Sequence, residues 1–79
     1  AGGDLYKSEQ FLQRGIAADP SYTLLRLDLA KVYIRQKRWV GARTQLERLI
    51  ATKQPTYPAD YALDDKPEAE SLLRSIAGR

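Results

Sequence analysis

Apolar residues recur along the chain at intervals of three and four, with polar residues between them. The clearest stripe lies between residues 39 and 50 and consists of Trp39, Ala42, Leu46, Leu49 and Ile50. This spacing brings the apolar side chains to one face of an α-helix, whereas a half-buried strand would alternate apolar and polar residues. The same reasoning, with prolines and polar clusters as boundaries, predicts helices at residues 4–18, 22–36, 39–53 and 66–77. The predicted fold class is therefore all-α.

Short signals at the ends of these segments set the predicted helix boundaries. Three side chains are placed to accept hydrogen bonds at helix N-termini: Asp4, Ser21 and Asp65. The first helix is expected to end just before Pro20, which restricts the preceding residue to extended conformations. The last helix is expected to open with a capping box, in which Asp65 and Glu68 flank Pro67. Residues 55–65, with their prolines and aspartates, are expected to form a loop with at most one helical turn.

A shift of 34 residues superposes the first predicted helix on the third, with large residues on large and small on small. The aligned pairs are Leu5 with Trp39, Ser8 with Ala42, Leu12 with Leu46, and Ile16 with Ile50. A fixed period of this length indicates a repeat architecture, in which each repeat is one supersecondary unit. The first and third helices are therefore predicted to be equivalent copies, separated by one intervening helix.

A 34-residue period of two antiparallel helices, with Asp19 and Pro20 at the join, resembles the tetratricopeptide repeat (TPR) family. The matching residues of the family pattern are Leu29, Ala30, Tyr33, Trp39, Ala42, Leu46 and Leu49. Lys37 departs from the pattern, because it stands at the turn where the family usually has glycine. A left-handed backbone at this lysine would cost about 1 kcal/mol.

The resemblance implies one TPR-like domain over residues 1–79, folded as an α-α superhelix of antiparallel helix-turn-helix repeats. Its parts are expected to be the second helix of a partial repeat, a complete repeat, a loop and a capping helix, at residues 4–20, 21–54, 55–65 and 66–78. Fewer than about three repeats are marginally stable alone. The chain is therefore expected to be a fragment or the C-terminal end of a longer array.

The family's architecture also implies a non-catalytic protein–protein interaction scaffold, whose concave face is lined by the first helix of each repeat. On the helix at 22–36, one arc of residues accounts for the core, and a second apolar stripe lies opposite it. The predicted groove residues on that second stripe are Leu24, Leu27, Lys31, Ile34 and Arg35. They are expected to bind an apolar peptide or helix with acidic residues. The alternative is that the chain's own residues 54–66 or its last helix cover this stripe.

Self-association is the main alternative function. The helix at 4–18 lacks the partner helix that would precede it in a full repeat. Its uncovered apolar side, with Leu5, Tyr6 and Phe11, is expected to meet solvent, a preceding segment or a second copy of the chain. A homodimer through these three residues therefore stays open.

The net charge of +3 is unevenly distributed, because residues 20–54 carry eight cations and two anions and are thus +6. Within this segment, residues 35–39 read RQKRW, and cations beside an aromatic ring are typical of nucleic-acid-binding surfaces. The cations are spread around two helices, however, and no base-reading motif is present. Trp39 is expected to be buried at the start of a helix, so nucleic-acid binding is only the third hypothesis.

The composition argues against catalysis. With no histidine and no cysteine, the chain lacks imidazole bases, thiolates, disulfides and the commonest metal ligands. The carboxylates between residues 60 and 70 fit neither a calcium-binding loop nor an acid–base pair. The sequence therefore predicts no enzyme, no cofactor and no metal site. No apolar run approaches the roughly 20 residues of a membrane span, so a soluble chain is expected, in a cytoplasmic or periplasmic compartment.

Overall fold

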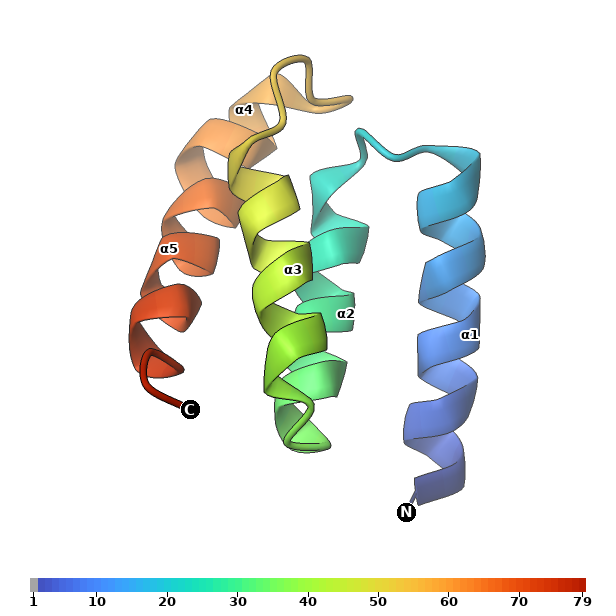
Figure 1. The fold of residues 1–79 in the computed structure, drawn as a ribbon. Helices are drawn as coiled ribbons and strands as arrows, with labels where there is room; N and C mark the ends of the chain where they lie inside the picture. The colour runs from blue at the N-terminus through green and yellow to red at the C-terminus, as the bar shows by residue number, and fades with distance from the viewer. Residues whose placement is uncertain (1) are drawn as a thin grey trace.

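The computed structural model describes residues 2–79 and consists of helices joined by short connections. The elements are α1 (Gly2–Ala18), α2 (Thr23–Arg35), α3 (Trp39–Ile50), α4 (Pro58–Asp60), the π-helical turn η1 (Tyr61–Asp65) and α5 (Lys66–Ser75). Figure 1 shows α1 and α5 at opposite edges of the molecule, with α2 and α3 between them. Each helix packs mainly against its neighbours in the sequence: α1 on α2, α2 on α3, and α3 on α5. The prediction of an all-α fold of antiparallel helices is confirmed.

The closest packing joins α2 and α3 into a helical hairpin. Ala30 on α2 and Ala42 on α3 are both 0% exposed, and their small side chains allow the helices to approach closely. Arg26 Nη1 donates a hydrogen bond to Gln45 Oε1 across the hairpin at 3.0 Å. Burial, and secondarily the positive charge of Arg48, lower the pKa of this guanidinium. The hairpin is therefore joined by apolar packing and by one polar contact at its edge.

The contact between α1 and α2 depends on Gly15. A Cβ atom at this position would lie 2.7 Å from Leu25 Cδ1, closer than carbon atoms can pack. The leucine side chain thus lies directly against the glycine backbone. Farther along the same interface, Gln13 Nε2 donates a hydrogen bond to Tyr33 Oη at 3.2 Å. These contacts hold α1 beside α2.

The turn between α2 and α3 places Lys37 in the left-handed region, with φ of 58°. The family usually has glycine at this position, and glycine adopts this conformation without steric cost. A lysine is strained there because its Cβ crowds the following carbonyl oxygen.

Replacing Lys37 with glycine is expected to raise the free energy of unfolding by about 0.5–1 kcal/mol. The steric cost disappears, although part of the gain is offset by the greater freedom of glycine in the unfolded chain. Urea denaturation measures the change. Gln36→Gly is the matched control, because Gln36 has φ of −87° and gains nothing from glycine. Equal effects of the two substitutions would show that the turn is not strained.

Three predicted caps are wrong. Helix α1 begins at Gly2, so Asp4 lies within its first turn rather than before it. Helix α2 follows Tyr22 and has no side-chain cap, while Ser21 donates its backbone N–H to Asp19 Oδ1 at 3.1 Å. Asp65 has α-helical backbone angles and caps nothing, because the chain is already helical when it reaches this residue.

The expected loop at 55–65 is also wrong over most of its length, because the chain becomes helical at Pro58 and continues through η1 into α5. Proline suits the first position of a helix, where its missing N–H needs no partner. Lys66 then donates its N–H to Tyr61 O, five residues back, as is typical of a π-helical turn. Long-range contacts support this segment: Tyr61 Oη donates to Ile50 O at 2.8 Å, and Thr56 N donates to Ser21 O at 3.0 Å.

Candidate functional site

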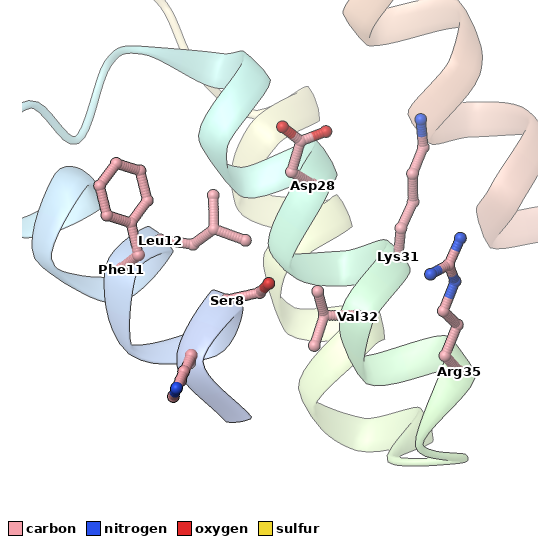
Figure 2. Close-up of a pocket in the computed structure, with 8 residues that line it drawn as sticks. Ser8, Phe11, Leu12, Asp28, Lys31, Val32 and Arg35 are labelled. Atoms are coloured by element: carbon pink, nitrogen blue, oxygen red, sulfur yellow. The ribbon is translucent and has the colours of Figure 1, made fainter. Parts of the chain in front are cut away.

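An open groove of about 500 Å³ runs between α1 and α2. Helix α1 contributes Lys7, Ser8, Phe11 and Leu12 to its lining, and helix α2 contributes Asp28, Lys31, Val32 and Arg35. Figure 2 shows Ser8 and Leu12 facing Val32 across the gap, with Lys31 and Arg35 along the outer side of α2. We call this hollow the α1–α2 groove.

The floor of the groove is apolar. Leu12 and Val32 are 8% and 9% exposed and belong to the core of the molecule. Phe11 is different, because its ring stands on the α1 side with 72% of its surface exposed (Figure 2). A large ring that exposes so much apolar surface is available for contact with another molecule.

Cations dominate the rim of the α1–α2 groove. Lys31 Nζ lies 2.6 Å from Glu68 Oε2 on α5, but both side chains are nearly half exposed, and such pairs stabilise little. Within the described part of the chain, Lys7 and Arg35 form no salt bridge. The groove thus presents two cations that are free to meet carboxylates.

Among the residues that the structure describes, Asp28 is the only carboxylate that lines the groove. Burial raises the pKa of this side chain, and Asp65 and Glu68 act in the same direction, whereas the positive charge of Lys31 opposes the shift. The raised pKa means that the fold holds a negative charge at Asp28 less favourably than water does. The positive charges of Lys7, Lys31 and Arg35 around the groove therefore outnumber the single carboxylate of Asp28.

The structure divides the residues that the sequence assigned to a groove on α2. Lys31 and Arg35 do line the α1–α2 groove. Leu24 is partly exposed, at 39%, but lies outside that lining. Leu27 is only 2% exposed, so its assignment to a binding surface is wrong. Ile34 is partly buried against the core and lines a second hollow.

The terminal segment covers Leu27, as the alternative to a groove on this stripe anticipated. The turn η1 packs on α2. Thr23 Oγ1, at the start of α2, donates a hydrogen bond to Asp65 Oδ2 at 2.8 Å, and both residues are buried. Together with the Lys31–Glu68 pair, this contact places η1 and α5 over the face that carries Leu27.

The residues considered for self-association lie on α1 with different exposures. Tyr6 and Phe11 are 58% and 72% exposed, whereas Leu5 is partly buried against the core. The sequence interpretation did not include Ser8 and Leu12 in a site. The 34-residue shift could have identified them, because it aligns them with Ala42 and Leu46, which are fully buried in the core.

The stretch at 35–39 has partners within the fold. Trp39 is partly buried against the core, and the Arg79 guanidinium lies 5.2 Å from the centre of its ring. Arg38 pairs with Glu9 at 2.8 Å and lies over the ring of Tyr33. The ring and one of the cations that suggested nucleic acid are thus engaged in intramolecular contacts.

Among residues 2–79, no three histidine, cysteine, aspartate or glutamate side chains gather closely enough to hold a metal ion. None of the helices described above has both the length and the apolar character that crossing a bilayer requires.

Comparison with known proteins identifies the repeat. A sequence profile of the tetratricopeptide repeat family matches residues 1–63, which is most of the chain. Searches of curated proteins and of solved structures gave no match. The profile covers α1, the α2–α3 hairpin and the start of the terminal helical segment, in agreement with the 34-residue period. The chain belongs to the tetratricopeptide repeat family.

Proposed function

We propose that the chain is a protein-interaction module that binds an apolar, acidic segment of a partner protein in the α1–α2 groove. Tetratricopeptide repeats generally mediate protein–protein interaction and are generally non-catalytic. The proposal adds a location and a ligand chemistry to that general role.

The observation that carries the proposal is the position of exposed Phe11 beside unpaired cations. Phe11 and the apolar floor offer a hydrophobic contact, while Lys7 and Arg35 offer charge to carboxylates. Aromatic residues and arginine are enriched among the residues that contribute most to binding at protein interfaces. Opposite charges on the partner would speed the encounter and exclude basic segments.

Self-association is the second candidate function, because Tyr6 and Phe11 are both exposed on α1. Sedimentation velocity at several concentrations distinguishes the two functions. A chain that stays monomeric well above the concentration at which it binds a peptide supports the partner-binding function.

Replacing Phe11 with serine is expected to weaken binding of an acidic peptide by about tenfold or more. The probe is a fluorescein-labelled synthetic peptide of leucine, alanine and glutamate, and fluorescence anisotropy gives its Kd. Val40→Ser is the matched control, because Val40 is equally exposed, at 75%, but lies on α3, outside the groove.

A second peptide, with lysine in place of every glutamate, tests the charge preference. It is expected to bind at least about tenfold more weakly than the acidic peptide. If Phe11→Ser and Val40→Ser weaken binding equally, or if the lysine peptide binds as tightly, the α1–α2 groove is not the binding site proposed here.

A further inference from the structure

The second hollow, of about 580 Å³, lies where the α2–α3 turn meets the end of α5. Figure 1 shows this turn and the C-terminal residues at the same end of the molecule. The residues that line the hollow are Ile34, Lys37, Trp39, Ser75, Ile76 and Arg79. Its volume is within the range of protein pockets that hold small molecules, about 300–1,000 Å³. We call it the turn hollow.

Three apolar side chains contribute to the walls of the turn hollow. Ile76 belongs to the core and is 2% exposed, and Ile34 and Trp39 are partly buried against the core. The Arg79 guanidinium lies 5.2 Å from the centre of the Trp39 ring. The hollow therefore combines an apolar surface with an adjacent cation.

The side-chain charges at the turn hollow are positive. Lys37 and Arg79 are exposed, and within the part of the chain that the structure describes neither forms a salt bridge. None of the described residues that line the hollow is an aspartate or a glutamate. Helix α3 begins here without a side-chain cap, so its dipole opposes those of α2 and α5, which end here. The two cations therefore decide the charge that the hollow favours, which is negative.

The backbone of Lys37 is a second indication of a ligand. Its φ of 58° is left-handed, a conformation that glycine adopts without steric cost and lysine does not. Residues held in such strained conformations cluster at ligand-binding and active sites. The side chain that strains the turn is also the one that brings an ammonium group to the hollow. A role of this ammonium in binding accounts for a lysine at a position that suits glycine.

We infer that the turn hollow binds a small amphipathic anion, in which an apolar or aromatic body carries one carboxylate. The carboxylate pairs with Lys37 and Arg79, and the body packs against Ile34, Trp39 and Ile76. A guanidinium can bind both oxygens of a carboxylate, while an ammonium supplies a compact charge. This inference goes beyond the function proposed above, because no residue lines both the turn hollow and the α1–α2 groove.

The test uses phenylbutyrate as the probe and phenylbutanol as the matched ligand, which has the same apolar body but no charge. Trp39 is the chain's only tryptophan, so the single indole N–H signal in a two-dimensional nitrogen–proton NMR spectrum reports from the hollow itself. We expect phenylbutyrate to shift this signal in a saturable way. It should bind at least about fivefold more tightly than the alcohol.

Lys37→Gly separates ligand binding from stability. It removes the ammonium together with the backbone strain, so it should bind phenylbutyrate at least about fivefold more weakly, although it unfolds at higher urea concentration than the parent chain. Lys37→Gln removes the charge alone and should weaken binding to a similar extent. Lys53→Gln, at an exposed lysine beyond the opposite end of α3, is the matched control and should change the Kd less than about twofold.

The inference is wrong if phenylbutyrate gives no saturable shift at Trp39, or if the acid and the alcohol bind equally. Shifts that cluster at Ser8 and Leu12 instead would place the acid in the α1–α2 groove. If Lys37→Gly gains stability and keeps its affinity, the lysine has no role in binding. Because the two sites share no residue, a peptide that fails to bind in the groove would overturn the proposed function without affecting this test.

Discussion

Replacing Leu46 with alanine is expected to lower the free energy of unfolding by about 2–5 kcal/mol. Leu46 is 0% exposed, on a helix that packs on both α2 and α5. Truncation leaves a cavity that the surrounding side chains fill only in part. Because small domains have little stability to lose, the variant should unfold at much lower urea concentration than the parent chain.

Leu12→Ala is the matched comparison, since Leu12 occupies the equivalent position on α1. Its truncation is expected to cost less, because the groove leaves one side of α1 uncovered and no closed cavity forms there. Leu63→Ala, at a residue that is 75% exposed, should change stability by less than about 0.5 kcal/mol. If both truncations lower the free energy of unfolding equally, the expected difference in packing between the equivalent helices α1 and α3 is wrong.

Replacing Thr23 with valine is expected to lower the free energy of unfolding by about 1–3 kcal/mol. The threonine hydroxyl donates the 2.8 Å hydrogen bond to Asp65, and the two residues are 2% and 5% exposed. Valine has nearly the same shape but no donor. A buried carboxylate that loses its partner keeps the cost of its desolvation.

A double-mutant cycle identifies the hydrogen bond as the cause. Asp65→Leu in the Thr23→Val background removes the unpaired carboxylate, so the double variant should recover much of the lost stability. Thermal unfolding followed by circular dichroism measures all four proteins. If Thr23→Val is as stable as the parent chain, the contact between Thr23 and Asp65 does not hold the terminal segment on α2.

Helices with local signals were predictable from the sequence. The stripe from Trp39 to Ile50 and the stop at Pro20 each act within a few residues. Helix α1 ends and α3 begins where they indicated, whereas α3 stops at Ile50, before the predicted end at residue 53. The helical character of residues 58–65 was not predictable in the same way. It depends on contacts with distant residues, such as the hydrogen bond from Tyr61 to Ile50 and that from Thr23 to Asp65.

The candidate site could be predicted only in part, for a related reason. A helical projection gives the direction of each side chain, and it placed Lys31 and Arg35 on a surface where the structure has a groove. It does not say which element lies in that direction. Leu27 lies one turn after Thr23 and one turn before Lys31, whose partners Asp65 and Glu68 come more than thirty residues later in the chain, so its burial could not be read from α2 alone.

Because each helix packs mainly on its sequence neighbours, the stability of one helix depends mostly on the helices next to it. Helix α1 is held chiefly by its interface with α2, whereas α2 and α3 are each held on two sides. In such a linear assembly, the end unit can open while the remaining units stay folded. A ligand that bridges α1 and α2 stabilises only the closed state, in proportion to its concentration over its Kd. Binding of a ligand between α1 and α2 would therefore also set how often α1 separates from α2.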